Sequence, residues 1–506
     1  MSRRALFLAT AGVVPLVLAL VWQQVLVSRA GAPPAPTASD PGAAPLTFVD
    51  HRERVLDRRG DVTWLFDARR VDVPGSGDYL VYELRRAEFR RRGAAGLTLR
   101  ADRAQIDQRT QNIALDGHLL AETQRGVRAE AGSAFWFESE GKFVAPQVDK
   151  LEWRDPARAD QPPTAIKTRR LFFWPRESRL DLPDGCELTR GAERVQAAAG
   201  SALIEKSLLQ MRGPLTVDAQ VAADGEPGAP SKSASKHRVV LTGAEGAQLA
   251  YDGRTGAGRV TGGVTVDLPG DGVRVVCREA TYSGRAQRRL RAEGDLSVTD
   301  PRNTLTASVA TVALGARQAE FVGPVHLVHR ATDGSTTLDG PRLTYGYATG
   351  ARRAEAWGGV ALDTGEAAAK ATRVRVDLEG EQAVLNGAVR LVTRPTPPAA
   401  GAGEVEHAKH RPVTVTADKL VHRFAAGKRR SEATGSPRFQ QGDRQGTCQR
   451  LAFDHERQVA VLDGGVRVWN KAGERARCGT LTYDLNRDEM RIERPVAAEF
   501  FLRDES

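Results

Sequence analysis

The sequence predicts an all-β protein, built as a long array of hairpin repeats behind one N-terminal transmembrane helix. Three observations predict this fold. Short alternating runs of Val, Leu, Ala and Thr, broken by Gly, Asp and Asn, fill most of the 506 residues, and such alternation is typical of strands. A pattern centred on one glycine recurs at intervals of about 30 residues, which indicates a repeat architecture. An uncharged apolar run lies close to the N-terminus.

The N-terminal run is long enough to cross a bilayer. Arg3 and Arg4 precede the stretch from Ala5 to Val27, which holds no charged residue, and a span of about 20 apolar residues is sufficient for a transmembrane helix. Basic residues before the span favour a cytoplasmic N-terminus. We therefore expect residues 1–29 to be a cytoplasmic tip and an inner-membrane anchor, with the rest of the chain in the periplasm.

A cleaved signal peptide is the alternative interpretation of this segment. The only small-residue cleavage motif, Ala30-Gly31-Ala32, is followed by Pro33, which is a poor context for cleavage. Residues 30–46 are rich in Ala and Pro, so we expect them to form an extended tether.

The repeat is anchored on glycines that align in similar sequence surroundings. Each follows a run such as IALD, AEAW or AVLD and precedes a run such as HLLA, GVAL or GVRV. The aligned residues are Gly117, Gly213, Gly262, Gly294, Gly323, Gly358, Gly387, Gly435 and Gly464.

From Gly213 onward two intervals are longer, 213 to 262 and 387 to 435, and they contain insertions rich in Pro, Gly, Ala and Ser, at 222–237 and 395–411. Because removing them restores the repeat interval, we interpret them as loops inserted into one array. The array is then divided into an N-terminal part, 47–221, and two further runs of repeats, 238–394 and 412–506. The repeat pattern is weak at about 140–205.

Alternation within each copy predicts which face of the strand is buried. Around Gly464 the apolar set is Ala460, Leu462, Val466 and Val468, whereas Asp463 and Arg467 are polar. Since side chains of a strand alternate between faces, one face of each strand is apolar. Glycine within a strand marks a bend or a close approach, so we expect each strand to fold over at its glycine and form an apolar trough.

A second strand precedes each glycine strand, and a polar turn joins the two as a hairpin. The preceding strand carries a small residue such as Cys277, Gly340, Ala371, Ala417 or Cys478, and it ends in sequences such as LTYG or LTYD. The turns are basic and recur at one point of the repeat, so they should line one rim. We hypothesise that these arginines attract lipid phosphates or an anionic membrane, with a solvated edge as the alternative: Arg288, Arg289, Arg352, Arg353, Arg429 and Arg430.

Hairpins of the form small-x-x-L-x-Y-D, turn, A-x-L-x-G-x-V-x-V resemble the OstA-like β-jellyroll of the lipopolysaccharide-export proteins LptC and LptA. The resemblance is clearest from Cys277 to Phe501, and the anchor followed by the segment 47–221 resembles LptC. It implies an elongated open, β-taco-like jellyroll. LptC has one short jellyroll, so this chain resembles an extended bridge or a fusion of both proteins.

The resemblance further implies a function and a set of partners. Acyl chains of lipopolysaccharide would lie inside the trough, received from an inner-membrane ABC transporter complex and passed on through edge-to-edge contacts with other β-jellyroll proteins. The inward positions that could contact acyl chains, or could form core only, are Val264, Val266, Leu296, Val325, Leu327, Val360, Leu362, Val389, Leu391, Val466 and Val468.

Two other function classes remain open. One is a structural or glycan-binding envelope β-solenoid with a filled interior, and the other is a β-solenoid enzyme, which needs clustered carboxylates that the sequence does not concentrate. We therefore expect a protein that is not an enzyme, with no cofactor and no metal. His326 and His329 should point to opposite faces of a strand. We also expect no nucleic-acid partner, because the net charge of +10 comes without aromatic residues interleaved among the basic ones.

Overall fold

The computed structural model describes residues 46–56, 62–74, 78–91, 94–154, 162–222, 236–284, 289–314, 316–331, 334–348, 350–394, 411–425, 427–471, 473–487 and 489–499. The expected membrane anchor at 1–29 and nearly all of the tether at 30–46 lie outside these residues. Among the described residues no helix is long and apolar enough to cross a membrane. The expected inserted loops, 222–237 and 395–411, also lie largely outside them.

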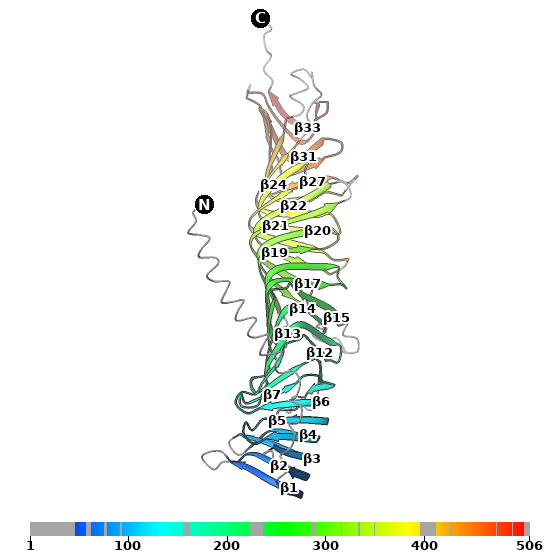
Figure 1. Ribbon diagram of the computed structural model, residues 1–506. Helices are drawn as coiled ribbons and strands as arrows, with labels where there is room; N and C mark the ends of the chain where they lie inside the picture. Colours follow the sequence, from blue (N-terminus) through cyan, green and yellow to red (C-terminus); the bar gives the residue numbers. More distant parts are fainter. Residues whose placement is uncertain are drawn as a thin grey trace, which may run out of the picture. The chain divides into compact units, whose positions relative to one another are not determined.

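The described chain is all-β and antiparallel, as the alternation predicts, and it divides into two compact units, one ending at Leu182 and the other starting at Pro183 (Figure 1). The strands of the first unit are β1 (Leu46–Leu56), β2 (Val62–Val73), β3 (Asp78–Arg91), β4 (Ala94–Asp107), β5 (Ile113–Thr123), β6 (Val127–Phe137), β7 (Lys142–Ala145), β8 (Lys150–Trp153), β9 (Thr164–Lys167), β10 (Leu171–Trp174) and β11 (Arg179–Leu182).

The second unit continues the same pattern with one short 3-10 turn, η2 (Ile204–Lys206). Its strands are β12 (Cys186–Arg190), β13 (Glu193–Leu203), β14 (Leu208–Ala222), β15 (Lys236–Gly243), β16 (Gln248–Asp252), β17 (Ala257–Leu268), β18 (Val273–Tyr282), β19 (Arg289–Thr299), β20 (Asn303–Ala313), β21 (Gln318–Ala331), β22 (Gly334–Gly346), β23 (Arg353–Asp363), β24 (Ala367–Asp377), β25 (Gln382–Thr393), β26 (Val413–Arg423), β27 (Arg430–Thr434), β28 (Arg438–Gln441), β29 (Arg444–Thr447), β30 (Arg450–Asp454), β31 (Val459–Trp469), β32 (Arg475–Asp484) and β33 (Glu489–Glu499).

The long strands of the second unit that carry an aligned glycine, such as β23, are bent at it. In β23 the ladder to β24 breaks between Trp357 and Val360, where Gly358 and Gly359 have φ of 94° and 91°. Side chains other than glycine rarely adopt such angles. A Cβ at Gly358 would lie only 2.8 Å from Pro341 Cγ. The glycine is therefore required both by backbone conformation and by close packing, and we call the line of these bends the crease.

The crease divides every long strand into two arms, and the expected alternation holds on both. In β31 the side chains of Ala460, Leu462, Val466 and Val468 are buried, while Asp463 and Arg467 are exposed. The ladder to β32 shifts register at the glycine, between Asp463 and Val466, and the apolar side chains on either side of the shift are buried. The interruption of the ladder thus lies at the glycine around which the sequence predicts a bend.

The outer face of the second unit carries charged pairs between neighbouring strands. Arg259 Nε lies 2.7 Å from Glu279 Oε1, and Arg274 Nε lies 2.6 Å from Asp267 Oδ1. Such exposed pairs contribute at most about 1 kcal/mol each. They help to hold the register, whereas burial of the inner face supplies most of the stability.

The region where the repeat pattern is weak, about 140–205, consists mostly of short strands. The bent strand is replaced there by separate four- or five-residue strands, β7 to β12. In the first unit, β7 pairs with residues 135–137 of β6 and β8 pairs with residues 127–130. Both arms are therefore present, although each is supplied by a separate short strand. Because the chain has no continuous bent strand here, it needs no glycine at a bend.

The interior of the first unit is filled by aromatic side chains. The ring centroid of Trp64 lies 5.2 Å from that of Trp136 and 5.3 Å from that of Phe89. Trp136 is fully buried and its Nε1 donates to Glu138 Oε2 at 2.7 Å. Buried aromatic contacts of this kind stabilise a core through their large apolar area.

Candidate functional site

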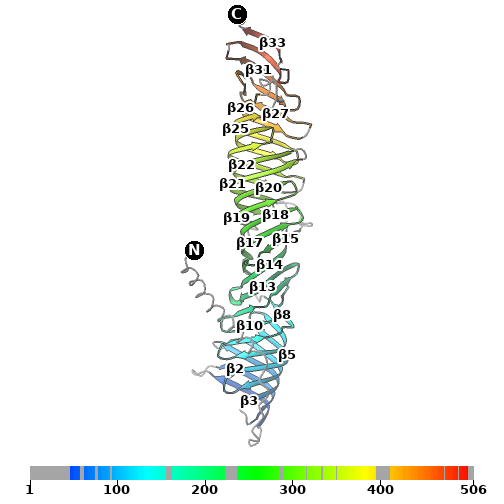
Figure 2. The ribbon, with the colours of Figure 1, turned by 45° about the horizontal axis from the view of Figure 1, so that its top comes forward.

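The predicted inward residues all lie in the interior of the second unit. Their side chains all come from one arm, the part of β17, β19, β21, β23, β25 and β31 that follows the aligned glycine, and they are at most 2 % exposed, except Val468 at 8 %. The second view of the ribbon shows these strands following one another in chain order (Figure 2). Their burial agrees with an apolar inner face, and their predicted contact with acyl chains stays a prediction.

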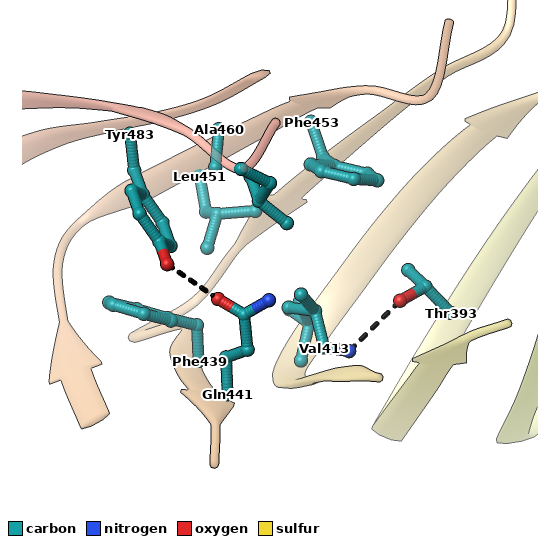
Figure 3. A pocket seen from close by; sticks show the side chains of 10 residues that line it. Thr393, Val413, Phe439, Gln441, Leu451, Phe453, Ala460 and Tyr483 are labelled. Carbon is teal, nitrogen blue, oxygen red and sulfur yellow. Dashed lines mark hydrogen bonds between the residues drawn. The ribbon is translucent and has the colours of Figure 1, made fainter. Parts of the chain in front are cut away.

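The interior differs from the predicted open trough in one respect, because side chains from the two arms meet. One small cavity of about 10 Å³ lies between the arms, lined by Val413 and Phe439 on one side and by Leu451 and Ala460 on the other (Figure 3). A cavity of this size holds about one water molecule. The inner side chains of both arms are almost inaccessible, for example Leu362 on one arm and Ala356 on the other, so an acyl chain enters only if the arms separate.

The arms end in two rims of turns. Rim A contains the turns at 314–317, 347–352, 378–381 and 424–429, and rim B contains those at 269–272, 300–302 and 364–366. The ends of β32 and β28–β29 continue rims A and B respectively. We call the space between the two rims the mouth.

The predicted basic residues occupy rim A, with different surroundings. Arg289, Arg353 and Arg430 are exposed, and Arg353 lies 3.9 Å from Asp377. Arg352 and Arg429 instead reach across the mouth. Arg288 lies outside the described residues. The hypothesis that these arginines attract phosphates stays a prediction, but three of them, Arg352, Arg353 and Arg429, already have carboxylate partners.

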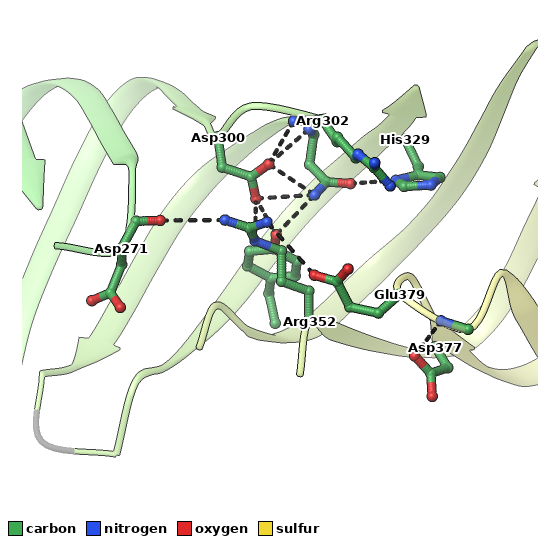
Figure 4. Close-up of polar contacts among 10 residues, drawn as sticks. Asp271, Asp300, Arg302, His329, Arg352, Asp377 and Glu379 are labelled. Atoms are coloured by element: carbon green, nitrogen blue, oxygen red, sulfur yellow. Dashed lines mark hydrogen bonds and ion pairs between the residues drawn. The ribbon is translucent and has the colours of Figure 1, made fainter. Parts of the chain in front are cut away.

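The most buried ion pair across the mouth, among the described residues, is made by Arg352. Its Nε lies 3.4 Å from Asp300 Oδ2, and its Nη2 donates to the backbone oxygen of Asp271 at 3.3 Å. Its Nη1 also lies 3.6 Å from Glu379 on its own rim (Figure 4). The side chain of Arg352 is 11 % exposed and that of Asp300 is 1 % exposed. Asp271 is paired again, with Arg317 of rim A at 3.4 Å.

Asp300 is also held by neutral polar groups. The hydroxyl of Tyr345 and the amide nitrogen of Asn303 both donate to it, and Asn303 Nδ2 also lies 3.1 Å from the Tyr345 oxygen. Burial raises the pKa of Tyr345 above its usual range, so its hydroxyl remains a donor. Because Asn303 Nδ2 donates to Asp300, its Oδ1 is the acceptor for His329 Nδ1 at 2.9 Å, which assigns the proton of a neutral His329 to Nδ1.

Contacts across the mouth continue toward the C-terminus. Arg429 of rim A pairs with Glu366 of rim B. Further along, the Tyr483 hydroxyl donates to Gln441 Oε1 at 2.8 Å and accepts from Arg444 Nη1 at 2.9 Å.

Backbone hydrogen bonds of the rims run along each rim. On rim A, the Leu378 nitrogen donates to the Arg352 oxygen and the Phe424 nitrogen to the Glu381 oxygen. On rim B, the Arg394 nitrogen donates to the Glu366 oxygen. Each rim is thus joined by backbone, whereas the contacts across the mouth described above all involve a side chain.

A buried histidine pair lies inside rim A. Ser431 Oγ is 2.9 Å from His422 Nδ1 and 2.7 Å from His455 Nε2. Burial lowers the pKa of His422 to about 3 and that of His455 to about 4. Both rings are therefore neutral near pH 7. His326 and His329 point to opposite faces as predicted, because His326 is half exposed and pairs with Asp339 while His329 is buried.

The described residues give little support to metal or nucleophilic chemistry. No group of three or more His, Cys, Asp or Glu side chains within the described ranges could hold a metal ion. The four cysteines are buried and unpaired by disulfides. Burial raises the pKa of Cys186, Cys277 and Cys448 to about 11, so their thiols are protonated at neutral pH.

Sequence reasoning found Arg352 and Arg429 of rim A but missed Arg317 and the acidic partners on rim B. Asp271, Asp300 and Glu366 lie in the turns that alternate with the basic ones, and this alternation of acidic and basic turns is the signal that could have revealed the pairing. No protein-family model and no curated protein matches the chain.

Proposed function

We propose that this protein is an inner-membrane-anchored lipid carrier, which holds the acyl chains of lipopolysaccharide between the two arms and passes the lipid from an ABC transporter toward the outer membrane. The observation that carries the proposal is the way the two arms are joined. They share backbone at the crease, while the contacts described at the mouth depend on side chains. Such an arrangement allows the arms to separate about the crease.

The composition of the interior supports the same proposal. Val360 and Leu362 of one arm and Ala354 and Ala356 of the other arm of β23 are each at most 2 % exposed. Small and branched apolar side chains on both walls suit an acyl chain, because burying apolar surface is favourable without directional contacts. The resemblance of the hairpins to the OstA-like β-jellyroll agrees with this function.

The terminal strands support contacts with partner proteins. Among the described residues, β1 pairs on one side with β2, and β33 pairs on one side with β32. Unpaired strand edges can accept a further strand from another protein. We propose that these edges receive neighbouring β-jellyroll proteins and the transporter complex, in a chain anchored through residues 1–29 with its bulk in the periplasm.

The second candidate function is a structural or glycan-binding envelope protein. The filled interior favours it, because the cavity between the arms has room for about one water molecule. In this case the arms would stay together and the inner side chains would serve as core only.

Site-specific photocrosslinking in cells tests the two candidates. A photoreactive residue is placed at the buried positions Leu362, Leu391 and Val468, and at Arg390 as an exposed control on the outer face. Lipid carriage predicts lipopolysaccharide adducts at the inner positions and none at Arg390. An absence of adducts at all inner positions, in a folded and membrane-bound protein, would support the structural function instead.

A further inference from the structure

We propose that the charged contacts across the mouth form a latch, which keeps the two arms together and opens to admit a ligand. This inference rests on the proposed function, because it concerns access to the same interior. The latch consists of three ion pairs between rim B and rim A: Asp271–Arg317, Asp300–Arg352 and Glu366–Arg429.

The position of these pairs gives them control over the mouth. Arg352 and Asp271 are 81 residues apart in sequence, yet the arginine donates to the backbone oxygen of the aspartate. Each pair joins a turn of rim A to a turn of rim B, whereas backbone hydrogen bonds join turns of the same rim. Breaking the pairs therefore removes the charged contacts between the arms without removing a ladder hydrogen bond, whereas the neutral contacts of Tyr345 and Tyr483 remain.

Charged side chains suit a latch better than apolar ones do. Opening an apolar seam exposes its surface to water at full cost. A buried ion pair has already lost hydration, and each partner regains it when the mouth opens. The pairing is also incomplete, because Arg352 Nε makes no hydrogen bond although it lies 3.4 Å from Asp300 Oδ2. The ion pairs themselves thus add little net free energy to the cost of opening, and separating the apolar inner faces is the larger part of that cost.

The distance between the rims can be measured in the full chain with two spin labels. Ser335 at the rim B end of β22 and Ala351 on rim A are exposed, and both tolerate conservative replacement by cysteine. The four native cysteines are buried, so the introduced thiols react selectively. Pulsed electron paramagnetic resonance then reports the distribution of distances across the mouth.

Variants of the latch should widen that distribution. We expect Glu366→Gln and Arg429→Gln each to increase the longer-distance population up to about fivefold, since removing a partly exposed pair shifts an equilibrium by that order. Exchanging the charges, Glu366→Arg with Arg429→Glu, should restore the wild-type distribution. Arg394→Gln is the matched control, because Arg394 Nη2 pairs with Asp363 at 2.6 Å on the same rim.

Two results would overturn the latch. One is an unchanged distribution in both single variants and in the double variant Asp300→Asn, Arg352→Gln. The other is an equal widening in Arg394→Gln. Circular dichroism of each variant shows whether it is folded.

Binding of purified lipopolysaccharide to the same variants separates the latch from the proposed function. If the mouth opens and no lipid binds, the latch stands and lipid carriage fails. If lipid binds at the wild-type rate while the distances never change, carriage stands and the latch fails.

Discussion

Asp300 Oδ2 and Arg352 Nε lie 3.4 Å apart, although the two residues belong to opposite rims and to different hairpins of the second unit. Both side chains are nearly inaccessible to water. Removing one member of such a pair leaves the other charge buried without compensation, which is far more costly than removing both.

We therefore expect Arg352→Gln to lower the free energy of unfolding by about 3 kcal/mol, as found for broken buried pairs. The double variant Asp300→Asn, Arg352→Gln should lose markedly less, because the only charge that it leaves without Arg352 is Glu379, whose side chain is 36 % exposed. Urea unfolding followed by circular dichroism measures both. Arg353→Gln is the control, since Arg353 is 69 % exposed and its loss should change stability by less than about 0.5 kcal/mol. Equal losses in the single and double variants would contradict this account.

Two neighbouring glycines at the crease make it possible to measure the cost of backbone strain and the cost of a steric clash separately. Gly358 and Gly359 have nearly the same φ, 94° and 91°. A Cβ at Gly358 would lie 2.8 Å from Pro341 Cγ, whereas a Cβ at Gly359 would meet nothing within 4 Å. We expect Gly359→Ala to cost about 1 kcal/mol from strain and Gly358→Ala to cost about 1–3 kcal/mol more from overpacking. Thermal and urea unfolding measure the loss of stability in each variant. Similar losses in the two variants would show that the close packing of Gly358 against Pro341 does not contribute.

The buried histidines predict a dependence of stability on pH. In the unfolded chain an imidazole binds its proton with a pKa of 6.5, whereas burial lowers the pKa to about 3 in His422 and about 4 in His455. Between these values the unfolded state binds more protons, so stability is lost as pH falls. We expect a loss of about 2–4 kcal/mol between pH 7 and pH 5.

The variant His422→Gln, His455→Gln tests the source of that loss. Its free energy of unfolding should change much less than that of the wild type over the same pH interval. A wild-type protein whose stability is flat from pH 7 to pH 5 would show that the two imidazoles do not titrate as their burial requires.

The cysteines predict slow thiol chemistry. With the pKa raised to about 11, about one thiol in a thousand of Cys277 or Cys448 is ionised at pH 8, and burial blocks access as well. Reaction with Ellman's reagent should therefore be slow in the native protein and become fast and complete in guanidinium chloride. Rapid reaction of these thiols with the reagent in the native protein would indicate that the strands near the crease become accessible to solvent.

Much of the fold could be predicted because its determinants are local. The apolar alternation around Gly464 fixes the inner face of β31, and the glycine itself marks the bend. The position of Arg352 and Arg429 within the repeat also predicts that both lie on the same rim. These features depend on residues a few positions apart along one strand or turn.

The closure of the mouth could not be predicted in the same way. Whether the two walls meet depends on the packing of side chains from hairpins distant in sequence. The pairing of Arg352 with Asp300 requires the stacking of several hairpins to be known. The broken strands β7 to β12 were not predicted either, because their arms come from separate short segments without the repeat pattern.

The hydrogen bonds that run along rim A also determine how the edge of the second unit can deform. The nitrogen of Tyr347 donates to the oxygen of Arg317, that of Leu378 to Arg352, and that of His455 to Arg429. Turns tied in sequence this way bend as one continuous ribbon, so no single turn swings out alone. A separation of the two rims that begins at one turn would therefore spread to the neighbouring turns. The rate of this spreading would depend on the stiffness of rim A.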